Sequence, residues 1–283
     1  MAYPTISGPY GLVPVNLIGG RAFVGSTRMV PIRSGYSEHI SFGDVVQIDT
    51  ATGTLVRSAV GTPGATQAVV NGTLGVFLGC EYSSSTGPIY GKNRYQNWAA
   101  NTVAADAIAY VADDPQQVFK AVALTNTGSA SNKVQAAFGQ IFLGSNLELV
   151  TNYTSNTLAA PTSGNSSGGL CAGSSNAKVT AAAPFRVVGF VNETALSVTT
   201  SIPSTVTNAT QTPASMTGIY PGMQVSGSGI TTPVYVQTVT SSTFTVNSSF
   251  TSAAGTNYTF TGAQEVLVAW NFGHHSYANG TGV

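Results

Sequence analysis

Charged residues are scarce in this chain. Of its 283 residues, 10 are Lys or Arg and 10 are Asp or Glu, which makes 7% charged residues and a formal net charge of zero. Soluble globular proteins carry charge on roughly a quarter of their residues, which keeps the surface hydrated and copies apart. A surface of hydroxyls, amides and small apolar groups is easier to desolvate. The composition therefore favours a structural part that packs against other subunits.

The scarcity also argues against several partners. The ten basic residues are scattered and no two are adjacent, whereas nucleic-acid binding needs clustered Lys and Arg. Every apolar run is much shorter than the 18 or so residues that span a bilayer. The first residues, MAYPTISGPYG, have neither the basic nor the apolar region of a secretory signal. We expect no nucleic acid, no membrane and no export.

Cysteine and histidine are almost absent. Without export, Cys80 and Cys171 are expected to be free thiols. His274 and His275 are adjacent, so on a strand they point to opposite faces and do not easily reach one metal. The only other imidazole is His39. We expect no metal, no cofactor and packing roles for the two C-terminal histidines.

Other candidates for chemistry are equally weak. Asp113 and Asp114 precede Pro115, which favours a cap or turn over a catalytic carboxylate pair. No G-x-S-x-G elbow, P-loop or dinucleotide fingerprint is present. Three aromatic residues near Lys92 and Arg94 are candidates for stacking on bases or sugars, or for packing at an interface: Tyr90, Tyr95 and Trp98. The sequence predicts no enzyme.

The secondary-structure pattern is almost entirely β. Short runs rich in Val, Ile, Phe and Tyr end at turn residues, and they predict strands over 44–48, 73–82, 107–111, 118–124, 185–191 and 265–272. A Thr-Ala-Thr-Gly turn ending at Gly53, with a second strand through Leu55, predicts a hairpin. At most one short helix is expected, near Asp113–Phe119, where Asp-Asp-Pro would form its start.

Residues 1–20 differ from the rest. Pro and Gly interrupt the segment too often for a full hydrogen-bond ladder, yet it is too apolar for a solvated tail. An extended arm that lies on another subunit fits both facts, with Tyr3, Tyr10 and Val13 as its anchors. The alternative is that the segment wraps its own barrel.

A second discontinuity lies near the C-terminus. From Ala195 to Gln264 there are 70 consecutive residues without Asp, Glu, Lys, Arg or His. Apolar residues still alternate, as in Phe244/Val246 and Tyr258/Phe260, which predicts a small β-sandwich. We therefore expect a β-barrel or β-sandwich body (21–193 plus 265–283) with a small β domain (194–264) inserted between its last two strands.

Several segments resemble a known family. They include Tyr10-Gly-Leu-Val-Pro-Val-Asn-Leu-Ile-Gly-Gly-Arg21, Gly75-Val-Phe-Leu-Gly-Cys80, Phe185-Arg-Val-Val-Gly-Phe-Val191 and Asn271-Phe-Gly-His-His-Ser-Tyr277. These are similar to capsid-associated structural proteins, of the decoration or cement type, of marine tailed bacteriophages that infect cyanobacteria. Residues 195–264 instead resemble immunoglobulin-like modules of phage virion proteins, through Pro221-Gly-Met-Gln-Val-Ser-Gly-Ser-Gly-Ile230.

The resemblance implies a non-enzymatic virion protein. It would sit on the capsid exterior, bind the major capsid protein and itself as a homotrimer, and be made in the host cytoplasm. Residues 194–264 would project outward and either have no ligand or make weak contact with host-surface glycans. Two alternatives stay open: a tail or head–tail joining protein with an adhesion role, and a carbohydrate-active enzyme or lectin. The main capsid protein is disfavoured because no long spine helix is visible in the sequence.

Overall fold

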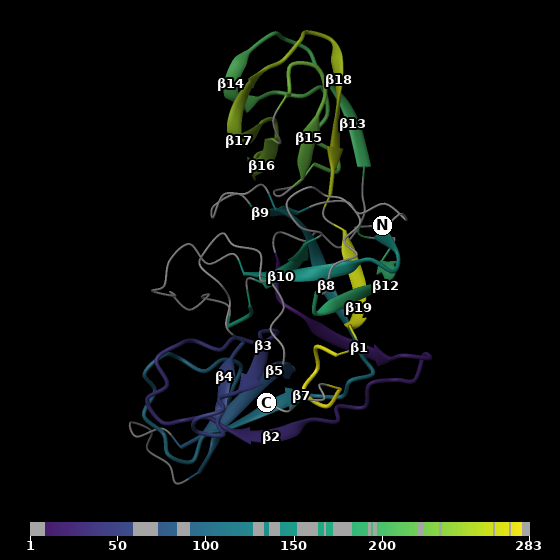
Figure 1. Cartoon of the computed structure of the whole chain (residues 1–283). Coiled ribbons are helices and arrows are strands. Elements are labelled where there is room, and N and C mark those ends of the chain that lie inside the picture. Colours follow the sequence, from purple (N-terminus) through teal and green to yellow (C-terminus); the bar gives the residue numbers. More distant parts are fainter. Residues whose placement is uncertain are drawn as a thin grey trace.

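The computed structural model describes residues 9–58, 73–83, 91–126, 133–135, 142–151, 164–166, 168–171, 183–191, 194, 197–219, 223–231, 234–262, 264–271 and 273–278. Within these residues the chain forms strands and turns and no α-helix, so the predicted all-β class is confirmed. The strands form three sheets (Figure 1). Several strands begin and end where the sequence pattern predicts, most closely Thr73–Tyr82 and Phe185–Val191.

The first sheet contains a closed five-strand barrel. Its members, in order around the ring, are β8 (Gln117–Asn126), β11 (Gly168–Cys171), β10 (Asn146–Thr151), β12 (Phe185–Val191) and β19 (Glu265–Trp270). The pairing of β19 with β8 closes the ring. Two further strands pair with β8: β1 (Val13–Leu17) and β9 (Lys133–Gln135). Closure removes the free edges of the five strands.

The second sheet comes from the first part of the chain. Its strands, in order, are β2 (Arg28–Pro31), β7 (Ile108–Ala112), β5 (Thr73–Tyr82), β3 (Val45–Ile48) and β4 (Leu55–Arg57), with β6 (Asn93–Tyr95) paired to β5. The predicted hairpin is confirmed by the pairing of β3 with β4. In its turn, the Thr52 hydroxyl donates to Asp49 (2.6 Å) and Gly53 adopts a positive φ of 67°. Glycine adopts this left-handed conformation without strain.

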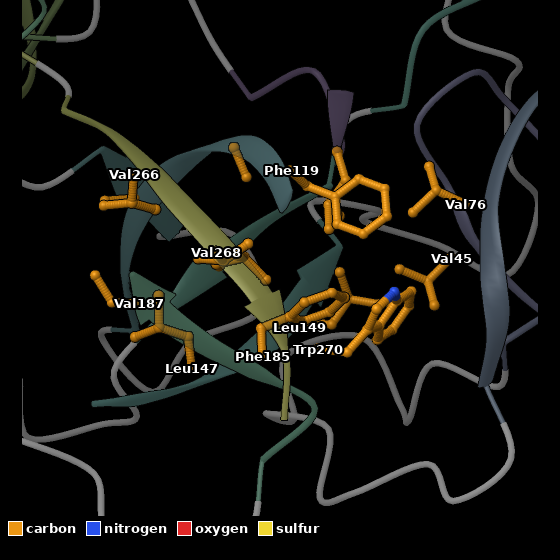
Figure 2. Close-up of a cluster of buried hydrophobic side chains, with 14 of the residues drawn as sticks. Val45, Val76, Phe119, Leu147, Leu149, Phe185, Val187, Val266, Val268 and Trp270 are labelled. Atoms are coloured by element: carbon orange, nitrogen blue, oxygen red, sulfur yellow. The ribbon is translucent and has the colours of Figure 1, made fainter. Parts of the chain in front are cut away.

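The two sheets share one core. Val45 and Val76 of the second sheet pack in the same apolar cluster as Phe119 and Trp270 of the barrel. Figure 2 shows these two valines on one side of the cluster, facing the Phe119 and Trp270 rings. The Trp270 ring packs edge-on against Phe119 (5.5 Å between centroids) and tilted against Phe185 (4.8 Å). The barrel and the second sheet are therefore joined by buried apolar contacts as well as by chain connections.

The third sheet is built from the uncharged segment. Its strands, in order, are β13 (Ser197–Ile202), β18 (Thr256–Thr261), β15 (Gln224–Ser226), β16 (Val234–Val239), β17 (Phe244–Thr251) and β14 (Thr207–Gln211). They surround a separate apolar core. The predicted alternation is confirmed, because Phe244, Val246, Tyr258 and Phe260 are all buried there. In Figure 1 this sheet lies beyond the barrel, at the opposite end from the second sheet.

The chain enters and leaves the third sheet at one place. β12 leads into it, β19 follows it, and the two strands are antiparallel partners in the barrel. The last residue of β12, Val191, lies directly opposite the first residue of β19, Glu265. The third sheet is thus an insertion between two paired neighbouring strands. The β12–β19 ladder continues up to Val191 and Glu265, and we call this point, where the chain enters and leaves the third sheet, its root.

Residues 113–119, the one place where the sequence allows a short helix, form a turn and the start of β8 instead. The Asp114 carboxylate accepts a hydrogen bond from the Gln116 backbone N–H (2.7 Å), and the Asp114 carbonyl accepts one from Gln117 (3.0 Å). These bonds form a turn, after which residues 117–119 begin β8. Asp-Pro suits a turn as well as a helix start, and burial of Val118 and Phe119 in the barrel decides between them.

Candidate functional site

The predicted interface residues start at the N-terminal segment. Tyr3 lies outside the described residues. Val13 begins β1 and pairs with Lys120 of β8, and Tyr10 lies just before this strand. The β1–β8 register is irregular between Pro14 and Asn16, as expected for a strand that contains proline. This placement corresponds to the alternative in which the segment wraps its own barrel; contact of Tyr3, Tyr10 and Val13 with another subunit stays a prediction.

The Tyr10 side chain joins a polar cluster at the root of the third sheet. Its hydroxyl donates a hydrogen bond to the carboxylate of Glu265. The ammonium of Lys120 lies 3.1 Å from the same carboxylate oxygen and 5.8 Å from the centroid of the Tyr10 ring. Glu265 is only 5% exposed, so its charge is balanced by Lys120 and stabilised by the hydrogen bond from Tyr10.

The electrostatics of the cluster favour a structural role. Burial of the ring, together with the adjacent Glu265 carboxylate, raises the pKa of Tyr10 above its usual value, so the phenol keeps its proton. The Glu265 backbone N–H also donates to the Thr194 hydroxyl (2.9 Å), which in turn donates to the Val191 carbonyl (2.8 Å). One glutamate therefore fixes the N-terminal segment, β8 and the chain crossing into the third sheet.

Sequence reasoning missed Glu265 and Lys120 as members of this cluster. One signal was present, because Glu265 is the first charged residue after the 70-residue uncharged stretch. A buried charge needs a partner, but the sequence does not say which of the scattered basic residues supplies it. That information depends on the pairing of β19 with β8, which places Lys120 beside Leu267.

The histidines have packing positions. His274 and His275 are 6% and 1% exposed, and the His275 ring lies edge-on to both Trp270 (5.2 Å) and Tyr277 (5.0 Å). Desolvation lowers the pKa of His275, against the attraction of Asp113. His39 accepts a hydrogen bond from the Ala100 backbone N–H (3.2 Å). The part of the chain that the structure describes contains no group of three or more His, Cys, Asp or Glu side chains arranged for a metal ion.

The two aspartates before Pro115 have separate roles. Asp114 forms the turn described above, which confirms the predicted turn at this site. Asp113 accepts a hydrogen bond from the Tyr277 hydroxyl (2.5 Å) and lies 3.7 Å from the guanidinium of Arg28. The carboxylates are therefore used in a turn and in a charge cluster with Tyr277.

The three aromatic candidates near Lys92 and Arg94 are Tyr90, Tyr95 and Trp98, and the structure describes two of them. Tyr90 lies outside the described residues. Trp98 is fully buried and cannot stack on a ligand, and the Tyr95 ring already stacks on Tyr82, with 4.2 Å between centroids. The structure thus places these two rings in packing within the chain itself, and packing of this segment at an interface stays a prediction.

Of the two cysteines, Cys80 is a buried free thiol, as predicted, and burial raises its pKa to about 12. Cys171 is the last residue of β11, and its side chain lies outside the described part. Among the residues that the structure describes, there is no helix of the length and apolarity needed to cross a bilayer.

Comparison with known proteins gives no relative. No protein-family model, curated protein or solved structure matches this chain.

Proposed function

We propose that the chain is a non-enzymatic structural protein of a tailed bacteriophage, which decorates and stabilises the outer surface of the capsid. The observation that carries the proposal is the pairing of Val191 with Glu265 at the root of the third sheet. It joins a closed barrel to a separate, uncharged sheet through two adjacent chain crossings. Such a chain has one part suited to sit on a lattice and another suited to project from it.

The proposed mechanism is mechanical. The barrel and the second sheet would sit where capsid subunits meet, and their contacts would have to break before the lattice opens. Specific protein interfaces bury on the order of 1,200–2,000 Å². The partners would be the major capsid protein and further copies of this chain, in a homotrimer at three-fold sites. A surface with so little charge loses little favourable hydration when such contacts form.

The third sheet would be an immunoglobulin-like module that points away from the shell. Its β16 strand supports a folded, two-layer arrangement, because Val234 and Tyr235 pair with β15 whereas Val236–Val239 pair with β17. Exposed hydroxyls occupy opposed positions on paired strands, such as Thr207 and Thr251 (2.9 Å). Hydroxyl-rich, uncharged faces suit either no ligand or weak contact with polysaccharide, which an array of glycans probed with the whole protein would separate.

The test is a cryo-EM reconstruction of virions that contain this chain, with the copy number measured by quantitative mass spectrometry. Regular density over the capsid lattice and hundreds of copies would support the decoration role. Density at one vertex or in the tail, with tens of copies or fewer, would overturn it in favour of a joining or adhesion protein.

A further inference from the structure

A pocket of about 560 Å³ lies where the outward side of β12 meets the end of β19 and the residues after it. Its size falls within the roughly 300–1,000 Å³ of ligand sites in proteins. Its apolar walls include Ile18, Val188 and the buried Trp270. Along β12, Phe185 and Val187 point into the core, so Arg186 and Val188 face outward into this pocket. None of the motifs in the sequence indicates this pocket.

The pocket carries one positive charge. Arg186 is the only Lys, Arg, Asp or Glu among the described residues that line it. The Nε–H of Arg186 donates to the amide oxygen of Asn146 (3.2 Å), and no described carboxylate forms an ion pair with it. His275 also lines the pocket, but its lowered pKa leaves it uncharged near neutral pH. An apolar pocket whose guanidinium has no carboxylate partner among the described residues is complementary to an apolar group next to a carboxylate.

Three large apolar or aromatic side chains at the rim of the pocket are exposed. Ile18, Val188 and Tyr277 are 51%, 44% and 52% exposed. The Tyr277 hydroxyl already donates to Asp113 and accepts from Arg28, so its ring is fixed and can be covered without loss of a hydrogen bond. Fixed, half-exposed aromatic rings beside a pocket are common anchors in protein interfaces. A small ligand would cover only the parts of these side chains that face into the pocket, whereas a polypeptide segment would also cover their outer parts.

We propose that this pocket is a docking site for an extended segment of a partner protein. The segment would insert an apolar side chain beside Trp270 and place the carboxylate of a neighbouring Asp or Glu on Arg186. The site is separate from the Tyr10–Glu265 cluster. It does not depend on the decoration role, since any partner with this chemistry would fit.

The test uses the full chain and two fluorescein-labelled peptides, GSLDLSG and GSLKLSG, in fluorescence anisotropy titrations. The Asp peptide is expected to bind saturably and the Lys peptide roughly tenfold more weakly, because a charge-assisted hydrogen bond is replaced by repulsion. Arg186→Gln should remove this preference, and Val188→Ser should weaken binding of both peptides. Arg33→Gln and Val24→Ser are matched controls, because both residues are exposed elsewhere on the chain and should change neither affinity.

Near-ultraviolet circular dichroism shows whether each variant is folded, and both test residues are exposed, so their replacement should be tolerated. Absence of saturable binding, or equal affinity for the two peptides, would overturn the proposal. Tight binding of dodecanoate without peptide binding would instead indicate a small-molecule site. Dimerisation that Arg186→Gln abolishes would indicate a second copy as the occupant. Binding that appears only after deletion of residues 279–283 would indicate that the chain covers the pocket itself.

Discussion

The hydroxyl of Tyr10 donates a hydrogen bond to the carboxylate of Glu265, across 255 positions of sequence. This contact ties the segment before the first strand to the first residue of the last one. Because Glu265 also binds Thr194 through its backbone, the same residue anchors the root of the third sheet. The stability of the N-terminal segment and that of the root are therefore expected to change together.

Tyr10→Phe removes the hydroxyl and leaves Lys120 as the partner of the buried Glu265 carboxylate among the described side chains. A hydrogen bond to a charged group contributes about 2 kcal/mol, so the free energy of unfolding should fall by that order. The measurement is the urea midpoint at constant m-value. Tyr95→Phe is the control, since the Tyr95 hydroxyl forms no hydrogen bond with a described side chain and its ring still stacks on Tyr82. Equal midpoints for the two variants would contradict the assigned role.

Leu12→Ala tests whether the N-terminal segment is part of the core. Leu12 is fully buried in the cluster shared by the barrel and the second sheet. Loss of its side chain should lower the thermal midpoint by roughly 10 °C, from a cavity cost of about 2–5 kcal/mol. Val15→Ala, in the same segment but 43% exposed, should have a much smaller effect. Equal thermal midpoints for the two variants would show that Leu12 does not act as a core residue. Because Leu12 is buried, a truncation that tests the proposed arm should stop before Pro9.

Asp44→Asn should change the pH dependence of stability. Asp44 is fully buried, and desolvation raises its pKa above the ordinary 3.8, opposed by hydrogen bonds from Ser166 and Ser41 and by Arg57. A raised folded-state pKa means that the protonated group stabilises the fold below pH 3.8, and this contribution is lost as pH rises through the folded pKa. Asn keeps an acceptor for the Ser41 N–H, so the variant should gain stability relative to the unmodified chain as pH rises above about 4. Urea unfolding between pH 3.5 and 7 measures the difference, and parallel profiles would contradict it.

Gly75→Ala should destabilise the second sheet. A Cβ at this position would lie 2.3 Å from the Ala112 carbonyl oxygen and 2.8 Å from a methyl of Val111. The oxygen belongs to the end of paired strand β7 and cannot move freely, so we expect a loss of about 3 kcal/mol in the free energy of unfolding. Gly91→Ala is the matched control, because a Cβ at that position would meet no atom within 4 Å. Thermal unfolding of both variants makes the comparison, and similar midpoints would be inconsistent with the close approach at Gly75.

Replacing residues 192–264 by Asn-Gly should leave a folded barrel. Val191 and Glu265 are direct partners, and a two-residue turn of this sequence joins antiparallel strands. The hydrogen bond from the Glu265 N–H to Thr194 and that from the Ala123 N–H to Gln264 are lost, so the thermal midpoint should fall by roughly 5 °C. Retained near-ultraviolet dichroism from Trp270 and cooperative unfolding are the expected results. An aggregated or non-cooperative product would show that the barrel needs the third sheet.

Local patterns predicted much of the fold. Alternation at Phe244/Val246 and Tyr258/Phe260, and the turn ending at Gly53, depend on residues that are neighbours in sequence. Period-two alternation determines which side chains share a face of a strand, and turn residues determine where the strand ends. These features identified the all-β class and the uncharged segment as a separate sheet before any pairing was known.

The sequence by itself determined the class of fold, the positions of most strands cited above and the scarcity of groups for chemistry. The tertiary structure decided which strands pair, that residues 117–119 begin a strand instead of a helix, and that Lys120, Tyr10 and Glu265 meet. It also placed Arg186 and Val188 in one pocket with Trp270. The reason is physical: alternation and turn chemistry act over a few residues, whereas charge pairing and pocket formation depend on strands that are distant in the chain.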